Sequence, residues 1–344
     1  MKRQLMVLAM MTLFALLAVP PLAAATSLQP TVLTTWEPAP WGSFAESMGS
    51  DSHGDLYVSR TTWGYYDRYT MDDNTAEVWK VAADGSRTLV ATEPVSPFAM
   101  VTGIAIDSDD QVYVAIFDYS NAYGIYDSPS GVFKVGEGSL TRVLSLPPGT
   151  FPNGLAFHKG KLYISDCERG AIWRVRVGEG AADPAAPWLM SALLAPPNSY
   201  AIGANGIAFK GDTLYAVVSS SGRILKVPVR YDGTAGEAVV LCKHPELRSA
   251  DGIAFDMLGR LWVVTNGSKL TPDGGLWRVA LDGSLRMIAN DPGWLNYPVM
   301  PVFGRTCSTA TTLYVLNGAY YDYVDGSAPD LVSLQIGVAG LPLR

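Results

Sequence analysis

Residues 251–265 read Asp-Gly-Ile-Ala-Phe-Asp-Met-Leu-Gly-Arg-Leu-Trp-Val-Val-Thr. Apolar and polar residues alternate in two short runs, residues 252–256 and 260–265, which predicts two strands that each pack on at least one face. Two further strands are predicted downstream, at residues 275–280 and 285–289, and Asp282-Gly283 supplies the tight hairpin turn between them. This stretch therefore predicts a sheet of four short antiparallel strands.

The same pattern occurs five times along the chain, and only the residue that opens the first strand changes its chemistry. We call this residue the mouth residue; in chain order it is Glu46, Thr102, Asn153, Asn205 and Asp251. Successive mouth residues lie 56, 51, 52 and 46 positions apart, and a sixth, degraded copy includes residues 313–316. A period near fifty with four strands per copy predicts an all-β fold, a six-bladed β-propeller.

The last copy has no fourth strand of its own. Residues 331–338 have the pattern of a third strand, whereas residues 31–36 look like an outer strand followed by Pro38. Proline cannot donate to a strand ladder, so it suits the exit from an outer strand. We therefore predict that the N-terminal strand closes the ring, and that residues 26–344 form one propeller domain.

Residues 1–25 have the features of a cleaved signal peptide. Lys2-Arg3 precedes an apolar run at residues 5–19, and Ala23-Ala24-Ala25 forms a small-residue cleavage site. An uncleaved membrane anchor is the alternative, but the run is short and is broken by Pro20-Pro21. We expect a secreted or periplasmic protein with no membrane insertion after cleavage.

Composition excludes several classes of function. A net charge of −7 without basic clusters argues against nucleic-acid partners. Cys167, Cys242 and Cys307 lack zinc-site spacing and cannot all pair with one another, which leaves one disulfide, Cys242 with Cys307, as an open option. The oligomeric state is left open too.

The common catalytic motifs are absent from the sequence. There is no Gly-x-Ser-x-Gly elbow, no His-Glu-x-x-His motif and no Walker loop. Of the three histidines, His53 and His158 fall in hairpin turns at the face opposite the mouth residues, and only His244 lies on the favourable side. A Ser-His-Asp hydrolase is therefore not expected.

Four mouth residues carry oxygen donors, two carboxylates and two amides. The first strand of each propeller blade lines the central channel, so Glu46, Asn153, Asn205 and Asp251 should point to one spot on the axis. Such a donor set suits a hard cation such as Ca²⁺, which takes about six to eight oxygen ligands. The alternative, that the Asn-Gly and Asp-Gly pairs only form turns, does not account for Glu46.

At these residues the chain resembles the calcium-dependent six-bladed propellers of the senescence-marker-protein/gluconolactonase family, to which the paraoxonases are related. The motifs are Glu46, Asn153-Gly154, Asn205-Gly206 and Asp251-Gly252, and the resemblance covers residues 31–338. It implies that Glu46, Asn205 and Asp251 bind calcium, or another divalent cation, with Asn153 as a further ligand or substrate contact. It also implies hydrolysis of a small-molecule lactone or related ester, with Asp251 as base or nucleophile.

Substrate preference should come from the connections between the second and third strands, which lie on the face of the mouth residues. Three of these connections are long and aromatic, and the others, such as residues 166–170 and 219–222, are short. We expect an aromatic wall over one side of the site and an apolar or aromatic substrate. The wall is predicted at residues 59–77, 117–130 and 317–329, with Trp63, Tyr66, Tyr119, Tyr123 and Tyr321 as substrate contacts.

Two other functions remain open on the same fold. A strictosidine-synthase-like propeller would share the repeat but would perform condensation without the metal ligands. A non-catalytic secreted binding propeller would keep the axial ion for structure alone. Metal content separates the first alternative from a calcium-dependent hydrolase, and turnover of a lactone or ester separates the second.

Overall fold

The computed structural model describes the chain over residues 28–37, 42–63, 66–67, 70–71, 74–97, 99–118, 130–178, 186–199, 201–267, 274–319 and 328–342. At residues 66–67 and 70–71 only the backbone is described. The predicted signal peptide, residues 1–25, lies outside this part of the chain and stays a prediction.

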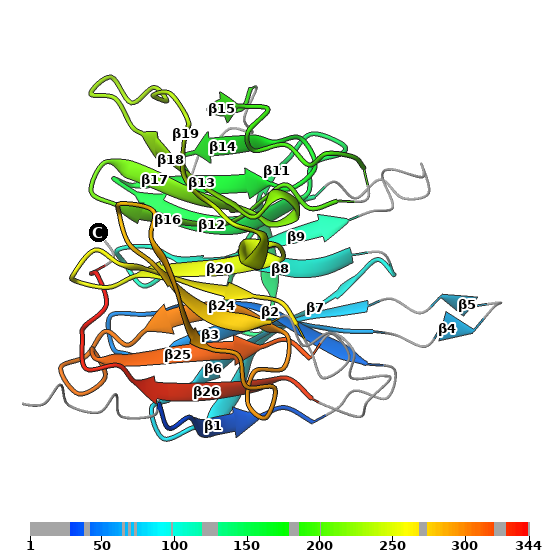
Figure 1. The fold of residues 1–344 in the computed structure, drawn as a ribbon. Helices are drawn as coiled ribbons and strands as arrows, with labels where there is room; N and C mark the ends of the chain where they lie inside the picture. The colour runs from blue at the N-terminus through cyan, green and yellow to red at the C-terminus, as the bar shows by residue number, and fades with distance from the viewer. Residues whose placement is uncertain are drawn as a thin grey trace, which may run out of the picture.

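The described residues form six antiparallel sheets of four strands (Figure 1). Each sheet is one blade, and the blades are numbered here in the order of their first strands, which are the innermost. The first three blades follow each other along the chain: blade 1 is β2 (Ser43–Ser50), β3 (Leu56–Thr62), β6 (Asn74–Val81) and β7 (Arg87–Val95), blade 2 is β8 (Ala99–Ile106), β9 (Val112–Asp118), β10 (Gly131–Val135) and β11 (Leu140–Ser145), and blade 3 is β12 (Pro152–His158), β13 (Lys161–Asp166), β14 (Ala171–Val175) and β15 (Leu189–Met190).

The other three blades complete the ring. Blade 4 is β16 (Ala204–Lys210), β17 (Thr213–Val218), β18 (Arg223–Pro228) and β19 (Val239–Lys243), blade 5 is β20 (Ala250–Phe255), β21 (Leu261–Thr265), β22 (Gly275–Val279) and β23 (Leu285–Ala289), and blade 6 is β24 (Pro298–Phe303), β25 (Thr312–Asn317), β26 (Asp330–Gln335) and β1 (Thr31–Thr35). Each inner strand contacts the inner strand of the next blade, and β24 contacts β2. The six-bladed propeller is therefore confirmed.

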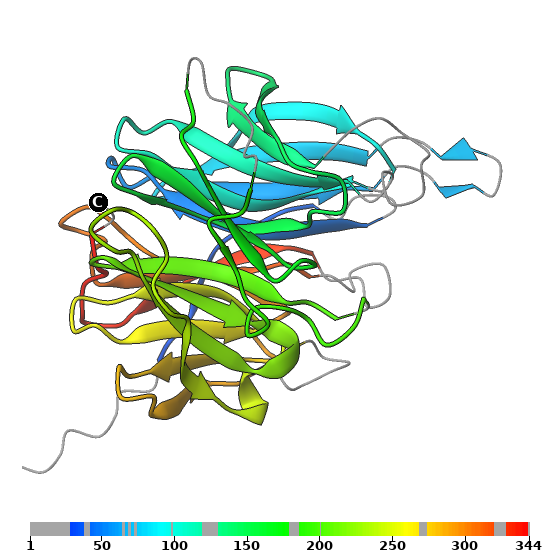
Figure 2. The same cartoon turned by 90° about the horizontal axis from the view of Figure 1, so that it is seen from above.

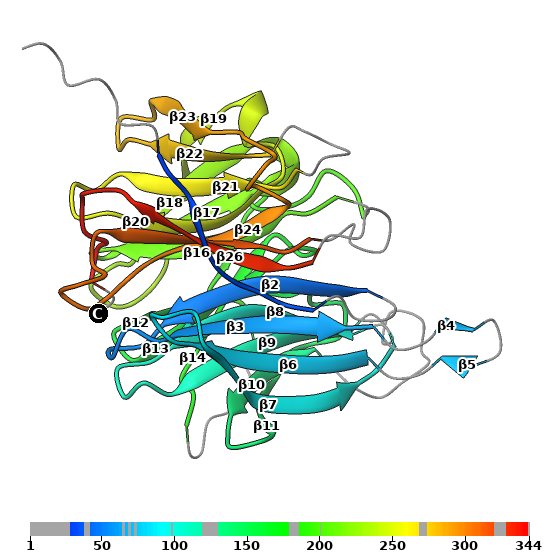
Figure 3. The ribbon, with the colours of Figure 1, turned by 90° about the horizontal axis from the view of Figure 1, so that it is seen from below.

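The N-terminal strand closes the last blade, as predicted. Strand β1 pairs antiparallel with β26, from Thr31 opposite Ser333 to Thr35 opposite Asp330. Figures 1 and 3 show this blue strand beside the red one, so the two ends of the chain meet in one sheet. The Trp36 side chain is buried directly after β1 and anchors the strand.

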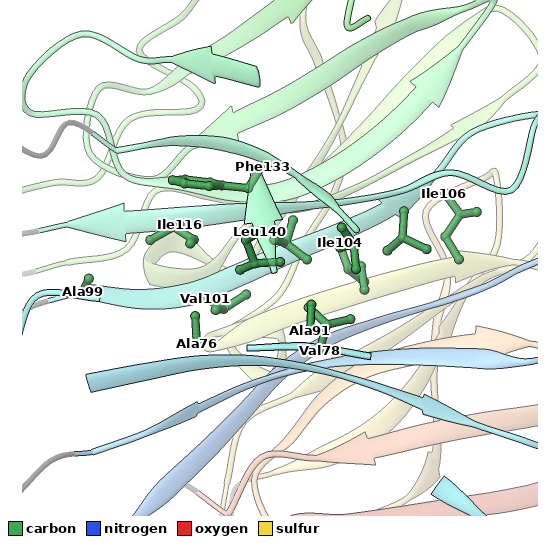
Figure 4. Packing of buried hydrophobic residues seen from close by; sticks show 13 residues of the cluster. Ala76, Val78, Ala91, Ala99, Val101, Ile104, Ile106, Ile116, Phe133 and Leu140 are labelled. Atoms are coloured by element: carbon green, nitrogen blue, oxygen red, sulfur yellow. The ribbon is translucent and has the colours of Figure 1, made fainter. Parts of the chain in front are cut away.

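Six apolar clusters hold neighbouring blades together, one cluster for each pair of blades. Figure 4 shows the cluster between blades 1 and 2, where Ala76 and Val78 of β6 face Val101 and Ile104 of β8. Burial of one such aliphatic side chain stabilises the fold by roughly 1.5–3 kcal/mol. Because every cluster needs two blades, the ring is stable as a whole and a single blade is not.

The predicted loop at residues 59–77 is wrong in its bounds. Strands β3 and β6 extend well into it, and their ladder runs to Thr62 opposite Thr75. An ion pair inside this extension, between Arg60 Nη1 and Glu77 Oε2 at 3.2 Å, joins the two strands as a cross-strand pair. The connection is therefore residues 63–73, and it includes the short strands β4 (Tyr66–Asp67) and β5 (Thr70–Met71), which project from the ring (Figures 1 and 2).

The cysteines form no disulfide. Cys167 and Cys242 are buried free thiols, and Cys307 is an exposed one. Cys242 lies on the outer strand of blade 4, whereas Cys307 follows the inner strand of blade 6, so the ring separates them. In the described residues, no helix is long and apolar enough to cross a membrane.

Candidate metal centre

Every inner strand is irregular at its mouth residue. In all six blades the pairing of the first with the second strand shifts register there, between residues 45 and 47, 101 and 104, 152 and 155, 204 and 207, 250 and 253, and 298 and 300. A β-bulge leaves one residue unpaired and redirects its side chain. The repeat thus places one residue per blade at the same point beside the axis, with Val299 in the sixth copy.

The glycines that follow the mouth residues allow close contact between blades. A Cβ atom added to Gly154 would lie 2.6 Å from the Asn205 carbonyl oxygen, and one added to Gly206 would lie 2.2 Å from that of Asp251. Neither glycine has a positive φ, and both lie inside strands. The alternative that the Asn-Gly and Asp-Gly pairs only form turns is therefore wrong.

The four oxygen-bearing mouth residues form one buried group. Their exposed fractions are 8% for Glu46, 7% for Asn153, 5% for Asn205 and 6% for Asp251. Asn153 Nδ2 donates to Glu46 Oε1 at 3.2 Å across the ring from blade 3 to blade 1. Thr102 of blade 2 is turned away from the group, since its hydroxyl donates to the Pro152 carbonyl at 2.7 Å.

Without a cation, the two carboxylates of this group are costly to ionise, because both are buried and their charges repel each other. Burial raises the pKa of Glu46 well above its usual value, the nearby charge of Asp251 raises it further, and the Asn153 amide lowers it in part. Burial also raises the pKa of Asp251 to about 7, against the opposing effect of hydrogen bonds from Asn266 and Asn205. A cation between the two carboxylates would reverse both shifts.

One atom of the group has no hydrogen-bond partner. Asn205 Oδ1 is buried and unpaired, while its Nδ2 donates to Ser219 Oγ at 3.1 Å. A buried amide oxygen without a donor is costly, and a bound cation would satisfy it. The described residues contain no group of three or more His, Cys, Asp or Glu side chains fit to hold a metal. A cation held here would therefore need amide oxygens beside the two carboxylates, a mixture that Ca²⁺ accepts.

Sequence reasoning missed two residues that contact this group, Ser219 and Asn266. Asn266 Nδ2 donates to Asp251 Oδ2 at 2.8 Å and to the Pro298 carbonyl at 3.1 Å. Each of the two residues directly follows the last residue of a second strand, β17 or β21. A polar residue at that point in successive repeats is the signal that could have identified them.

The histidines lie away from the group. His158 stacks on Phe209 with ring centroids 4.3 Å apart and bonds Asp212 through Nε2 at 2.9 Å. His53 is in the turn between β2 and β3, and exposed His244 caps the short 3₁₀ helix η3 (Pro245–Leu247), accepting from the Glu246 amide.

The predicted aromatic wall is only partly within the described residues. Trp63 is partly buried and packs against the cluster between blades 6 and 1, Tyr66 is described by its backbone in β4, and Tyr119, Tyr123 and Tyr321 lie outside the described residues. The short connections are confirmed on the opposite side, where β14 begins five residues after β13 ends and the 3₁₀ helix η2 (Ser219–Ser221) joins β17 to β18.

Comparisons with known proteins support the fold. No protein-family model matches this sequence, and no curated protein matches it. Among solved structures, one described as a gluconolactonase is similar with a TM-score of 0.58 and 14% identity, over 92% of this chain and 95% of the other. A gluconolactonase from Xanthomonas campestris has a TM-score of 0.54 and 17% identity, over 89% and 90% of the two chains.

A protein of different chemistry is equally similar. The aldose sugar dehydrogenase from Streptomyces coelicolor, solved with bound PQQ, has a TM-score of 0.56 and 15% identity, over 90% of this chain and 98% of the other. One fold can host many reactions, so these similarities do not choose between hydrolysis and oxidation. The chain shares the propeller fold of these enzymes, and its function must be argued from the residues of the candidate site.

Proposed function

We propose that this protein is a calcium-dependent hydrolase of lactones or related esters, exported to the periplasm or the exterior. The observation that carries the proposal is the buried group of two carboxylates and two amides on the propeller axis, in which the Asn205 oxygen is unpaired. The fold shared with gluconolactonases is consistent with it.

The proposed ligands are Glu46, Asn153, Asn205 and Asp251. Calcium, or another divalent cation, would supply Lewis-acid polarisation of the substrate carbonyl and stabilise negative charge on its oxygen. The protein's part is to hold two negative side chains close together in a site with little access to water. Without a cation this arrangement is unfavourable, as the raised pKa values of both carboxyls show.

Asp251 is the proposed base or nucleophile. Its Oδ2 is bonded by Asn266, so we assign the reaction to Oδ1, which would take a proton from the attacking water or attack the carbonyl carbon directly. A cation beside Asp251 would keep this carboxyl ionised near neutral pH, which is the form that takes a proton or attacks a carbonyl. Among the four proposed ligands, Glu46 is the other carboxylate, and it is bonded by Asn153.

The proposed substrates are apolar or aromatic lactones, because the long connections of blades 1, 2 and 6 are rich in tyrosine. These blades are neighbours around the ring, and the connections of blades 3 and 4 on the other side are short. The proposed contacts are Trp63, Tyr66, Tyr119, Tyr123 and Tyr321.

The test is a panel of lactones and aryl esters assayed with and without chelator, together with elemental analysis. We expect about one equivalent of calcium, turnover that is lost with chelator and regained with calcium, and no turnover by Asp251→Asn. Calcium without turnover would favour a binding propeller with a structural ion. Protein that is purified without metal and neither binds added calcium nor gains turnover from it would contradict the proposal.

A further inference from the structure

A second ring of residues surrounds the mouth residues. In each blade, one residue of the second strand pairs with the residue before the mouth residue. The residue that follows this pairing partner in the chain is defined here as the collar residue. The register gives one collar residue in every blade, in order Thr61, Phe117, Cys167, Ser219, Asn266 and Gly318. The six residue types differ, which is why the sequence alone does not reveal the ring.

Each collar residue contacts the next blade just ahead of its mouth residue. Three of them donate to the carbonyl of the residue before the mouth: Cys167 Sγ to Ala204 at 3.0 Å, Ser219 Oγ to Ala250 at 2.5 Å, and Asn266 Nδ2 to Pro298 at 3.1 Å.

The remaining three collar residues touch the same region by other means. Thr61 Oγ1 accepts from the Val101 amide at 2.9 Å, Gly318 O accepts from the Ala45 amide at 3.4 Å, and Phe117 stacks on Phe151 with centroids 3.8 Å apart. The collar is therefore a built feature of all six blades.

Two collar residues also bond the mouth residue of their own blade. Ser219 Oγ accepts from Asn205 Nδ2 at 3.1 Å, and Asn266 Nδ2 donates to Asp251 Oδ2 at 2.8 Å. Both side chains therefore lie between a proposed ligand of one blade and the backbone of the next.

Ser219 helps to fix how the Asn205 amide is turned, beside the hydrogen bond from Asn205 to Asp251. A serine hydroxyl has one proton, and the Ala250 carbonyl can only accept, so this proton is committed to Ala250. Toward Asn205 the hydroxyl can then only accept, which requires the NH₂ group on that side. Asn205 Oδ1 therefore points away from Ser219, and in that position it has no hydrogen-bond partner.

Asn266 acts on Asp251 in a corresponding way. Its NH₂ group serves two acceptors, the Asp251 carboxylate and the Pro298 carbonyl. A flipped amide would set its own oxygen against both of them, so the orientation is fixed. The Asp251 carboxylate is thereby held in one orientation through its Oδ2 atom.

We infer that Ser219 and Asn266 are positioning residues, which fix the atoms that Asn205 and Asp251 present to a cation on the axis. The inference rests on the proposed function for the identity of the cation, but the turned amide of Asn205 exists without it. Outer residues that orient metal ligands typically change metal affinity by about 10–100-fold when they are removed.

The decisive variant is Ser219→Ala, with Ser59→Ala as its matched control. Ser59 is another buried serine, in β3. Within the described residues its hydroxyl accepts from the Ser47 amide at 3.1 Å and shares its proton between the Ser47 and Thr102 carbonyls, so it bonds backbone groups alone. Ser219→Ala should raise the calcium Kd, measured by titration calorimetry, by about tenfold or more. Ser59→Ala should leave the Kd within about twofold and lower only the melting temperature.

A second series tests the hydroxyl itself. Ser219→Thr keeps an oxygen that both donates and accepts, so it should restore most of the affinity. Ser219→Cys keeps a donor toward Ala250, as Cys167 does toward Ala204, but thiol sulfur accepts weakly, so its affinity should be intermediate. Asn266→Ala should lower kcat more than it raises KM, because it releases the residue proposed to react.

A readout without metal separates this inference from the proposed function. In protein labelled with ¹⁵N-asparagine, we expect the side-chain NH₂ of Asn205 to be protected from solvent exchange in wild type and Ser59→Ala, and to lose protection in Ser219→Ala. Wild type that binds no calcium but shows this pattern would contradict the proposed function and leave the positioning role standing. Unchanged Asn205 protection and unchanged affinity in Ser219→Ala would overturn the positioning role.

Discussion

At the scale of single residues, the proposed metal centre combines a constant backbone with variable side chains. The bulge recurs in all six blades, but only four mouth residues carry oxygen donors of the kind that bind calcium. Thr102 and Val299 occupy the other two positions, where a backbone-bonded hydroxyl and an isopropyl group contribute no ligand. The site is thus set by which residues stand at six equivalent points.

The raised pKa of Asp251 predicts how metal-free protein responds to pH. Its pKa is about 7 in the fold against an ordinary value of 3.8, so the unfolded chain releases this proton first as pH rises. The contribution of Asp251 to the free energy of unfolding is therefore largest below pH 4. It falls as pH rises toward 7, by an amount on the order of 4 kcal/mol. Glu46 acts in the same direction.

Urea unfolding of metal-free protein between pH 4 and 8 measures this loss. Asp251→Asn, which has no charge to bury, should show a smaller decline with pH than wild type, and saturating calcium should abolish the difference. A decline of equal size in both metal-free proteins would show that Asp251 is not the group that titrates.

Glu46 and Asp251 should differ in what their replacement changes. Glu46→Gln removes a negative ligand but no proposed reacting group, so it should raise the calcium Kd while most of kcat returns at saturating calcium. Asp251→Asn should lose turnover at any calcium concentration. The measurement is kcat against free calcium for both variants, and wild-type kcat in Asp251→Asn would contradict the assignment.

At the scale of elements, two features hold the propeller together: the contact between neighbouring inner strands and the closure of the last blade. The glycine after a mouth residue lets the next inner strand approach, and β1 covers the edge of β26 that would otherwise be unpaired. Both features join segments far apart in the sequence.

Gly206→Ala should damage the ring where two proposed ligands lie. The new Cβ would stand 2.2 Å from the Asp251 carbonyl oxygen, and backbone cannot yield as a flexible side chain does. Gly136→Ala is the control, because its Cβ would meet only the Ser139 carbonyl at 3.5 Å. We expect a loss of roughly 1–3 kcal/mol for the first and little for the second, by thermal unfolding. Equal melting temperatures would contradict the close packing.

Removal of β1 should destabilise the whole propeller. A chain that begins at Trp41 lacks the β26 partner strand and the buried Trp36, whose ring stacks under the Arg87 guanidinium at 5.7 Å. Loss of a buried Trp side chain alone costs about 3–5 kcal/mol.

The matched control for this truncation is Val32→Thr in the full mature chain, since Val32 on the same strand is 56% exposed. It should melt within a degree or two of wild type. A shortened chain that melts like the full one would mean that β1 contributes nothing to closure.

At the scale of the whole molecule, the proposed function divides the propeller into a rigid ring and the connections above it. The ring holds the proposed metal ligands, and the connection at residues 63–73 of blade 1, with its β4–β5 hairpin, projects from the ring (Figure 2). Topology places this connection on the face of the mouth residues, because it joins the end of a second strand to the start of a third.

Replacement of residues 64–73 by a short turn should change substrate choice and leave calcium affinity unchanged. We expect a larger rise in KM for bulky apolar lactones than for small ones, because remote apolar contacts are lost. Calcium titration of the same variant is the control. An equal loss for all substrates would give the connection a general supporting role, and loss of calcium would place it within the metal centre.

The sequence by itself determined the fold class, the six copies, the closing strand and the positions of the four oxygen-bearing mouth residues, because each follows from a local pattern that repeats. It also placed the strands of blade 5 within two residues of their observed bounds. The sequence alone did not reveal the collar residues. Thr61, Phe117, Cys167, Ser219, Asn266 and Gly318 share no chemistry, and only the pairing of strands brings them to equivalent places.

Tertiary structure alone decided why the glycines are needed and how the donors are turned. The limit on Gly206 comes from a carbonyl of the next blade, 45 positions away at Asp251. The orientation of the Asn205 amide depends on the Ser219 hydroxyl and on Asp251. The folded structure also shows that β3 and β6 are longer than predicted, with the Arg60–Glu77 ion pair between them, and no local sequence pattern indicates this pair. Contacts between residues distant in sequence depend on register and on the closed ring, and these exist only once the chain has folded.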